Sequence, residues 1–425
     1  MSQTIFIQMA AYRDPELIPT ITDAIARAAD PRRLHFCVAW QHGDELAREA
    51  FAPLESKARL TILDIPYADS QGACWARHRI QQEYDGEDFT LHLDSHHRFV
   101  DGWDRVCIEM LEGLQASGVA KPLLTAYLPS FDPQDDPAAR QPDPWHLTFD
   151  RFIPEGPIFF RPAAIPGWQD LQAPTRSRFF SAHFAFTLGA FARDVQHNPE
   201  FYFHGEEITL AVRAFTHGYD LFHPHRLVAW HEYTRRGRTK HWDDHASTWG
   251  ARNVSTHVQC RRLFGMDEFR DDPAAVAEEQ RGPYGFGRVR SLEDYERYAG
   301  ISFGRRAITD AVLHSREPSP DDNREPSYDA FVATTIPRFK HCIDVGYDRV
   351  PLDDYDYWVV SFKDARGEEL FRQDVLPDEI AQMRADPDGY CKIWREFNTD
   401  EQPRTWVVWP HSASQGWCAP SVGQI

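Results

Sequence analysis

The stretch Leu91-His92-Leu93-Asp94-Ser95-His96-His97-Arg98-Phe99, LHLDSHHRF, brings three histidines and one aspartate together within six residues. It overlaps the run 89–93, in which apolar and polar residues alternate, a pattern that predicts a β-strand. Asp94 is then the last residue of the strand or the first of the following loop. In α/β sheets, ligands bind beyond the carboxyl ends of the strands, so this stretch marks a candidate ligand site.

Two of these side chains have the spacing of a metal site. Ser95 separates Asp94 from His96, so both side chains point the same way if the backbone stays extended, with Cα atoms roughly 6–7 Å apart. One divalent cation fits between them. A carboxylate oxygen with an imidazole nitrogen suits Mn²⁺ or Zn²⁺ better than Ca²⁺, which prefers oxygen ligands alone. The alternative is a solvated loop rich in histidine.

The sequence around this stretch alternates strand and helix patterns. Strands are expected at 4–9, 34–40, 60–65, 89–93 and 227–230, and helices at 14–29, 76–84, 206–216 and 247–263. This order predicts an α/β fold with a largely parallel sheet. Residues 129–176 contain ten prolines and are expected to form a long ordered loop or a lid.

The length of the chain favours two domains, because 425 residues exceed the size at which a single core stops growing. We expect a main domain at 1–314, a linker at 315–325 and a smaller, mostly-β accessory domain at 326–425. Tryptophans of this last region are expected to be mainly core residues, with stacking on sugar or peptide as the alternative. They are Trp394, Trp406, Trp409 and Trp417.

Composition excludes several classes of protein. Hydrophobic residues at 42% and aromatic residues at 13% are typical of a globular protein rather than a disordered one. The net charge of −19 disfavours nucleic acid or an anionic membrane as a general partner. The sequence contains neither a signal-type N-terminus nor a long apolar run, so we expect a soluble cytoplasmic protein. Its seven cysteines are scattered and are expected to be reduced thiols.

Three motifs, in this order, resemble polypeptide N-acetylgalactosaminyltransferases. They are QGACWARHR at 71–79, LDSHHR at 93–98 and FHGEEITLAVRAFTHGYDLFHPHRLVAWHEYTR at 203–235. The resemblance implies the Rossmann-like GT-A glycosyltransferase fold for residues 1–314, with a bound Mn²⁺ (or Mg²⁺) and a UDP-sugar as donor. It also implies that His231 is the third metal ligand beside Asp94 and His96, and that Arg77 contacts the diphosphate.

The sequence is also similar to the cytosolic GlcNAc-transferases that attach α-linked GlcNAc to a hydroxyproline of a ubiquitin-ligase adaptor. This likeness covers about residues 3–305 and includes SLEDYERYAGISF at 291–303. It implies transfer of GlcNAc from UDP-GlcNAc to a hydroxyl of a polypeptide acceptor, with retention at the sugar. The oligomeric state and the role of the last domain, which could recruit the acceptor or mediate self-association, stay open.

The same resemblance suggests roles for further residues. Glu206 would bind sugar hydroxyls and Glu207 would lie nearer the acceptor, the alternative being acids that merely favour the start of a helix. The predicted nucleotide-binding residues are Ala10, Ala11, Tyr12, Arg13, Gln41, Arg77 and Ser95. Tyr12 could instead be a core aromatic residue, and Arg77 a surface residue of its helix. His183 and His204 are weaker candidates for the same pocket.

The pattern departs from the galactosaminyltransferases at Tyr12-Arg13-Asp14, where those enzymes carry His-Asn-Glu, and at Glu207, which replaces an Asn. Their lectin-type C-terminal domain is not recognisable. Sugar and acceptor choice therefore cannot be copied from that family.

Other functions fit parts of the sequence. A metal-dependent hydrolase or phosphoesterase is suggested by DSHH at 94–97 and HWDDH at 241–245, although neither HxHxDH nor HExxH occurs. For 241–245 we favour a capping segment before the next helix. A glycosyltransferase for a glycan or small-molecule acceptor is a further alternative, and so is a carbohydrate-binding protein without catalysis.

Overall fold

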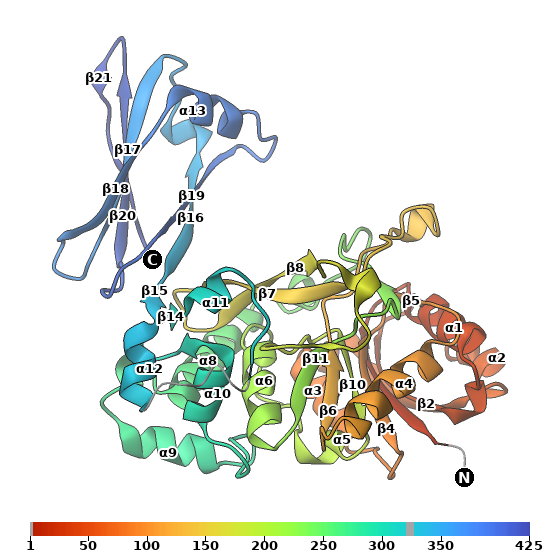
Figure 1. Ribbon diagram of the computed structural model, residues 1–425. Coiled ribbons are helices and arrows are strands. Elements are labelled where there is room, and N and C mark those ends of the chain that lie inside the picture. Colours follow the sequence, from red (N-terminus) through yellow and green to blue (C-terminus); the bar gives the residue numbers. More distant parts are fainter. Residues whose placement is uncertain (1–2, 320–326) are drawn as a thin grey trace.

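The computed structural model describes residues 3–319 and 327–425 and has a mixed α/β architecture around one large sheet (Figure 1). The predicted α/β class is confirmed. From one edge to the other, the sheet consists of β3 (Arg59–Pro66), β2 (Leu34–His42), β1 (Ile5–Tyr12), β4 (Phe89–Asp94), β10 (Phe184–Leu188), β6 (Pro122–Thr125), β11 (Asp220–His223) and β9 (Thr175–Arg176).

The first four of these strands are parallel, and their register brings the predicted ligand residues together. β1 lies between β2 and β4, with Ala10 opposite Asp94 and Tyr12 opposite Gln41. The carboxyl ends of the three strands therefore meet at one edge of the sheet. β10 is antiparallel to its neighbours β4 and β6, so the sheet is mostly rather than fully parallel.

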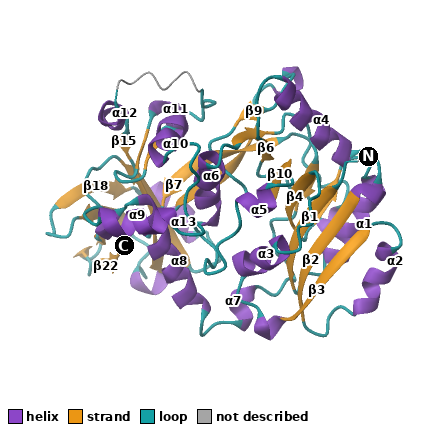
Figure 2. Ribbon diagram, turned by 90° about the horizontal axis from the view of Figure 1, so that it is seen from below, coloured by secondary structure: helices purple, strands orange, loops and turns teal. Residues whose placement is uncertain are grey.

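Helices cover both faces of the sheet, and Figure 2 shows α1 (Leu17–Arg27) and α3 (Ala73–Gln81) on opposite sides of it. Ile5 and Ile7 of β1 pack with α1 and α4 (Trp103–Ala116) in one core cluster. Phe6 points to the other face and packs near Ala76 of α3. Because β1 is buried on both faces, its sequence is an almost continuous apolar run.

The other helices lie at the edges of this core and beyond it. Of the predicted helices, 206–216 corresponds to α6 and 247–263 to α8 within two residues. The helices are α2 (Ala52–Glu55), α5 (Phe191–Asp194), α6 (Glu206–Thr216), α7 (His241–Asp244), α8 (Trp249–Phe264), α9 (Pro273–Arg281), α10 (Leu292–Ala299), α11 (Asp310–Leu313) and α12 (Tyr328–Thr334).

A short two-stranded sheet follows the end of β4. In it, β5 (His97–Phe99) pairs with β12 (Ala229–His231), and His231 lies opposite His97. The backbone of His231 also bonds to the segment before the proline-rich region, through its N–H to the carbonyl of Pro129 at 2.9 Å. His231 is therefore held beside the end of β4 although 137 sequence positions separate it from Asp94 (231 − 94).

The expectation that residues 129–176 form only a loop or lid is wrong in part. Within them, β7 (Trp145–Phe152) and β8 (Ile158–Ala164) form an antiparallel hairpin. The prolines fit this hairpin because Pro154 and Pro157 lie at its turn, and Pro162 belongs to a sheet of only two strands, where one side of each strand needs no partner. The proline content of this segment alone therefore could not predict the hairpin.

After the gap in the described residues, α12 lies close to α10. The hydroxyl of Tyr328 in α12 donates to the carboxylate of Glu296 in α10. β13 (Ile301–Ser302), β14 (Ala307–Ile308) and β15 (Ile336–Pro337) form a small sheet. Residues 320–325 of the predicted linker lie outside the described residues, and the proposed domain boundaries stay a prediction.

The last region contains two packed sheets, so the expected mostly-β character is confirmed. β16 (Phe339–Gly346) pairs with β19 (Tyr390–Phe397), and a five-stranded sheet is formed by β17 (Tyr355–Lys363), β18 (Glu369–Val375), β20 (Thr405–Ser412), β21 (Gly416–Trp417) and β22 (Ser421–Gln424). Ile343 of β16 and Val360 of β17 belong to the core cluster between the sheets. α13 (Pro377–Arg384) packs against it, and the region stands apart from the main sheet in Figure 1.

The tryptophans of this region do not follow the sequence expectation. Trp406 packs against the core as expected. Trp394, Trp409 and Trp417 instead are 46%, 41% and 46% exposed. For them the core expectation is wrong, because alternation along β19 and β20 turns Trp394 and Trp409 outward while their neighbours face the core.

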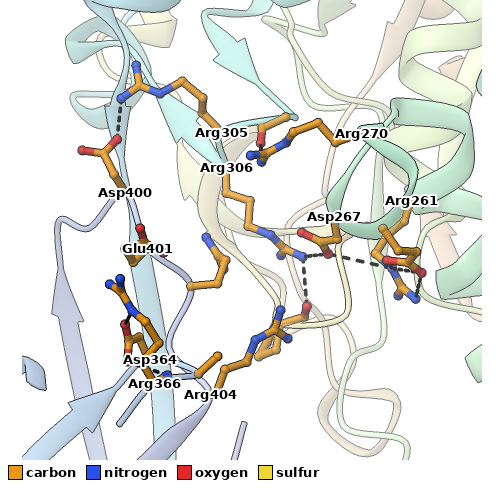
Figure 3. Close-up of a pocket in the computed structure, with 15 residues that line it drawn as sticks. Arg261, Asp267, Arg270, Arg305, Arg306, Asp364, Arg366, Asp400, Glu401 and Arg404 are labelled. Atoms are coloured by element: carbon orange, nitrogen blue, oxygen red, sulfur yellow. Dashed lines mark hydrogen bonds and ion pairs between the residues drawn. The ribbon is translucent and has the colours of Figure 1, made fainter. Parts of the chain in front are cut away.

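A cavity of about 1030 Å³ lies between the main part and the last region (Figure 3). Arginines and acids line it, and most of them pair with one another. Arg305 bonds to Asp400 across the two parts at 2.6 Å, and Arg306 bonds to Asp267 at 2.6 Å. The cavity contains none of the predicted site residues, and most of its charged side chains form ion pairs with one another. It marks the place where the two parts meet.

In the described ranges, no helix is both long and apolar enough to cross a lipid bilayer. The seven cysteines are free and five of them are buried, which confirms the expected thiols.

Candidate active site

Asp94, His96 and His231 converge beyond the carboxyl end of β4, as the sequence predicts for a metal site. Their ligand atoms all lie within 4.8 Å of one another. Oδ2 of Asp94 is 3.6 Å from Nε2 of His96 and 3.5 Å from Nε2 of His231. Asp94 is the last residue of β4, His96 lies in the turn that follows, and His231 ends β12. Strand pairing thus creates the group from distant parts of the chain.

His231 has two ring nitrogens that lack hydrogen-bond partners among the described residues, although its side chain is only 8% exposed. Leaving a buried polar atom unpaired costs about 1–3 kcal/mol, so such atoms call for an explanation. Burial lowers the pKa of His231 well below its ordinary value, which leaves a neutral imidazole with a free lone pair. That is the state in which imidazole binds a cation.

His96 is oriented by a carboxylate behind it. Nδ1 of His96 donates to Oδ2 of Asp14 at 2.7 Å, so Nε2 faces Asp94 with its lone pair available. Asp14 is buried and also accepts from Ser95 and from Arg238. Metal-binding histidines commonly donate their second N–H to a carboxylate in this manner. The donor set, two imidazoles and one carboxylate, therefore fits a divalent cation such as Mn²⁺ or Zn²⁺.

Arg77 lies behind Asp94 and is only 3% exposed. Its Nη2 donates to Oδ1 of Asp94 and, at 2.8 Å, to the carbonyl of Ala182. Burial alone would raise the pKa of Asp94, but the contact with His231 and the charge of Arg77 hold it well below the usual range. The predicted surface alternative for Arg77 is wrong. Because Arg77 is buried behind Asp94, it would contact a diphosphate only next to Asp94, or influence it indirectly through Asp94.

Glu206 faces inward, toward Arg77. One oxygen lies 3.7 Å from Nε of Arg77 and 2.9 Å from Nε2 of His197, which in turn stacks on His92 at 5.0 Å. Burial favours a high pKa for Glu206, but His197 and Arg77 lower it, so the group is a carboxylate. With 5% exposure, it is placed to fix Arg77 rather than to touch a sugar.

Glu207 has other partners than Glu206 and is less deeply buried. Its carboxylate accepts hydrogen bonds from the hydroxyl of Tyr127 at 2.7 Å and the backbone N–H of Ala182 at 2.9 Å. Burial raises the pKa of Glu207 to about 7. Near neutral pH this carboxyl group is therefore present in both protonation states.

Glycine at position 205 makes this pair of acids possible. Gly205 has a φ of +109°, and a Cβ there would lie 2.4 Å from Sγ of Cys260 in α8. The turn therefore requires both the left-handed backbone and the missing side chain. Glu206 and Glu207 start α6 directly after it and contact different partners, His197 and Tyr127 respectively.

A series of stacked rings leads from Tyr127, the partner of Glu207, to His231 of the predicted metal site. Tyr127 stacks on His183 at 5.1 Å, and His183 stacks on His231 at 4.1 Å. Nε2 of His183 accepts from the backbone N–H of Leu128 at 3.0 Å, which fixes that ring. The sequence suggested His183 only weakly and gave no signal for Tyr127, which belongs to an ordinary-looking strand end. His204, the other weak candidate, is exposed and packs on Phe159.

The predicted nucleotide-binding residues occupy the ends of β1 and β2. Arg13 bonds to Asp244 of α7 at 2.9 Å and to Glu45 at 3.2 Å. Tyr12 donates to Asp244 at 2.8 Å, so the core alternative for Tyr12 is wrong. Ala10 and Ala11 precede them on β1, with Ala10 beside Asp94.

Two other predicted nucleotide contacts are buried, at 2% exposure each. Gln41 bonds to the carbonyl of Ala11 and to Ser70. Ser95 donates to Asp14 at 2.6 Å. Both residues are placed to shape the strand ends rather than to contact a ligand directly.

The HWDDH segment forms α7 just before α8, and the carbonyl of His245 accepts the N–H of Trp249 at 3.1 Å, as a capping segment would. The segment also packs against the end of β1. His241 packs on Tyr12 at 5.0 Å and stacks on His245 at 4.1 Å. In the described chain, the only groups of three potential metal ligands are Asp94, His96 and His231, and the buried set His92, His197 and Glu206 beside Arg77. The sequence analysis did not predict Arg238, because isolated arginines are common in loops. Arg238 lies in the loop before α7 and forms ion pairs with Asp14 and Glu232.

Comparisons with known proteins identify the family of the chain. A sequence model of the family described as Glycosyltransferase (GlcNAc) matches residues 4–55 and 45–305. A search of curated proteins found no match. Among solved structures, the chain resembles GalNAc-T7 with UDP, GalNAc and Mn²⁺, at 12% identity and a TM-score of 0.48, over 70% of this chain and 55% of that chain. This chain thus spans about half the length of that relative.

Two other structures are similar at comparable levels. Staphylococcus aureus TarS has 10% identity and a TM-score of 0.39, over 100% of this chain and 77% of that chain. The mannosyltransferase PcManGT from Pyrobaculum calidifontis, in complex with GDP-Man and Mn²⁺, has 11% identity and a TM-score of 0.38, over 66% and 73%. The family match covers well over half of the sequence, and the chain therefore belongs to the glycosyltransferase (GlcNAc) family.

Proposed function

We propose that this glycosyltransferase moves GlcNAc from UDP-GlcNAc to a hydroxyl group of a polypeptide acceptor, with the help of one divalent cation and with retention at the sugar. The observation that carries the metal dependence is the convergence of Asp94, His96 and an unpartnered His231 beyond β4. The family description supports GlcNAc as the sugar. The likeness of residues 3–305 to the hydroxyproline GlcNAc-transferases supports the acceptor.

In this proposal Asp94, His96 and His231 hold Mn²⁺ (or Mg²⁺). When bound, the cation would stabilise the negative charge that develops on the β-phosphate of the leaving UDP. Arg77 keeps one oxygen of Asp94 occupied, so the other is free for the cation. Glu206 and His197 hold Arg77 in place from behind. Asp14 does the same for His96.

The acceptor side is assigned to Glu207. Its carboxyl group is held by Tyr127 and Ala182, with a pKa of about 7, and it starts α6 on the side of His183 and His231. A group of this kind can accept a hydrogen bond from an acceptor or sugar hydroxyl. A retaining front-face transfer needs no separate base, because the departing phosphate takes the proton of the acceptor hydroxyl.

The nucleotide side is assigned to Ala10, Ala11, Tyr12 and Arg13. The small side chain of Ala10 lies beside Asp94 at the end of β1, whereas Ala11 is buried in the core and would contribute through its backbone. Tyr12 and Arg13 supply a ring and a cation, which Asp244 orients. Gln41 and Ser95 stabilise these strand ends through hydrogen bonds to Ala11 and Asp14.

The hydrolase alternative has less support. It needs a second ion near the first, and His241 to His245 belong to neither group of metal-ligating atoms in the described residues. The buried set that includes Glu206 already contains a cation, the guanidinium of Arg77. Transfer to a glycan or a small molecule differs from the proposal only in the acceptor.

The proposal is tested by measuring UDP release from UDP-GlcNAc with Mn²⁺, with and without a hydroxyproline peptide, a serine peptide and an oligosaccharide. We expect release that the hydroxyproline peptide stimulates, one Mn²⁺ per chain, and loss of activity in Asp94→Asn but not in Asp101→Asn, an exposed aspartate. Stimulation by the oligosaccharide alone would overturn the polypeptide acceptor. Two ions per chain, or full activity of Asp94→Asn, would overturn the mechanism.

A further inference from the structure

Exposed aromatic rings gather on the outer face of the five-stranded sheet, near its far end. They belong to neighbouring strands, because Tyr357 of β17 lies opposite His411 of β20, which in turn lies opposite Trp417 of β21. Trp409 projects from the same face of β20. In Figure 1, β21 lies at the tip of the last region, away from the main sheet. We call Tyr357, Trp409, His411 and Trp417 the aromatic platform.

The rings contact one another closely. Trp409 and Trp417 have centroids 4.6 Å apart with planes inclined at 39°. Tyr357 stacks on His411 at 5.2 Å and 10°, and the edge of each faces Trp417 at 5.7 and 5.1 Å. Two inclined indoles beside a flat tyrosine–histidine pair offer several ring faces within a short span.

The platform is not needed to form the core of this region. None of its four members belongs to the cluster between the two sheets, where Trp358 and Phe362 fill the interior. Trp409 and Trp417 stay 41% and 46% exposed. Exposed clusters of large apolar side chains usually mark binding surfaces.

The platform is also held rigidly before any ligand binds. The indole N–H of Trp409 donates to the carbonyl of Cys418 at 2.8 Å. The turn between β20 and β21 is closed by the N–H of Gln415 to Ser412 at 3.0 Å and the N–H of Ser414 to Asp354 at 2.9 Å. A surface that is ordered in advance loses little conformational entropy on binding.

Polar groups at the edge of the platform indicate the charge of its ligand. Nδ1 of His411 bonds to Oδ2 of Asp356 at 2.9 Å, and Asp356 is 44% exposed. Asp354 also lies at the platform, because it accepts the N–H of Ser414 in the turn between β20 and β21. Carboxylates accept hydrogen bonds from hydroxyl groups and repel anions. Aromatic faces bordered by carboxylates therefore fit a neutral, hydroxyl-rich ligand.

We propose that the aromatic platform is a binding site for a neutral oligosaccharide. Pyranose rings present an apolar face of C–H groups, which suits the electron-rich faces of Trp409 and Trp417. Their hydroxyl groups would reach Asp356 and His411 at the edge. The site is separate from the proposed transfer centre and would retain the enzyme on a glycan near its acceptor.

A second copy of the chain is the other occupant that such a face suggests, and two observations count against it. β20, which carries Trp409 and His411, already pairs with β17 on one side and with β21 and β22 on the other, so these two residues do not lie on a free strand edge. Two copies would also bring together chains of net charge −19 and the carboxylates of Asp354 and Asp356 at the platform.

The test is calorimetric titration of the full-length protein with N-acetylchitotetraose, cellotetraose and maltotetraose, and with a sulfated heparin tetrasaccharide as the charged comparator. We expect at least one neutral oligosaccharide to bind more tightly than the sulfated one. Trp409→Ala and Trp417→Ala should each weaken this binding by at least about 10-fold. Trp249→Ala, a change at another exposed tryptophan on α8, should leave it unchanged.

Folding and catalysis are checked on the same variants. Near-ultraviolet circular dichroism should show intact variants, and UDP release without acceptor should equal that of the wild type, so failure of the platform and failure of the transferase proposal are distinguishable. UDP-GlcNAc should not displace the oligosaccharide. Absence of binding by all three neutral sugars, unchanged binding in Trp409→Ala with Trp417→Ala, or a dimer that Trp417→Ala dissociates in light scattering would overturn the proposal.

Discussion

Nη2 of Arg77 donates to Oδ1 of Asp94, and the other oxygen of that carboxylate is thereby left facing His96 and His231. The same guanidinium lies 3.7 Å from Glu206 on its other side. One buried cation thus sets the orientation of Asp94, the proposed central metal ligand, and lies beside two carboxylates. This arrangement explains why a basic residue on α3 matters to a site at the ends of the strands.

Replacing Arg77 by methionine should therefore damage both stability and activity. Asp94 and Glu206 would remain buried without their compensating charge, and breaking a buried pair in this way costs about 3–5 kcal/mol. We expect a large drop in the urea midpoint and loss of UDP release. Arg79→Met, at an exposed position of the same helix, should change neither. If Arg77→Met keeps wild-type stability and Mn²⁺ affinity, the bridging role is refuted.

Asp14 should control metal affinity without binding the metal itself. It accepts from Nδ1 of His96, and loss of such outer contacts typically weakens metal binding about 10–100-fold. We expect Asp14→Asn to weaken Mn²⁺ binding by this factor in calorimetry, with one site per chain retained. His231→Ala should abolish measurable binding at that site. An Asp14→Asn protein with unchanged Mn²⁺ affinity would show that His96 needs no such support.

The strands that carry this site could be predicted from the sequence, whereas the burial of several of its side chains could not. Alternation in 89–93 and the apolar run of β1 are local signals, so the ends of β1 and β4, and with them Asp94 and His96, follow from the pattern. Only the family likeness pointed to His231, because the pairing of β5 with β12 is long-range. Burial of Arg77, Glu206 and Ser95 depends on how helices pack on the sheet, which no local pattern reports.

The same limit explains the errors in the last region. A run such as Thr405 to Trp409 predicts a strand, and the structure contains it as β20. Which face of that strand is covered depends on the partner sheet, so the outward position of Trp409 was not predictable. In contrast, Trp406 lies three positions before Trp409, so its side chain points to the opposite face of β20, and it packs toward the core.

Glu207 should make stability depend on pH between about 4.5 and 7. Burial raises its pKa from 4.5 to about 7 in the folded state, so the protonated group stabilises the fold below the unfolded value, and this contribution is lost as pH rises through about 7. Between about pH 5 and pH 8, the free energy of unfolding of the wild type should fall by about 1–3 kcal/mol more than that of Glu207→Gln.

A second carboxyl group provides the control for this prediction. Burial also raises the pKa of Glu296 to about 7, but Glu296 lies in α10 and bonds to Phe303 and Tyr328, away from the metal group. Glu296→Gln should alter the pH dependence of stability in the same direction and leave UDP release unchanged, whereas Glu207→Gln should reduce sugar transfer. Parallel stability curves for the wild type and Glu207→Gln would contradict the assigned pKa.

Gly205 offers a test of how sharply the turn positions Glu206 and Glu207. Gly205→Ala combines the strain of a positive φ with a Cβ only 2.4 Å from Sγ of Cys260, so we expect a destabilisation of about 1–3 kcal/mol and weaker transfer. Gly118→Ala has a φ of +100° but no atom within 4 Å, and it measures the strain alone. In Gly205→Ala with Cys260→Ala the overlapping sulfur is removed, so stability should recover toward that of Gly118→Ala. If the double variant is no more stable than Gly205→Ala in urea denaturation, α8 does not fix this turn, and the acids are positioned by α6 itself.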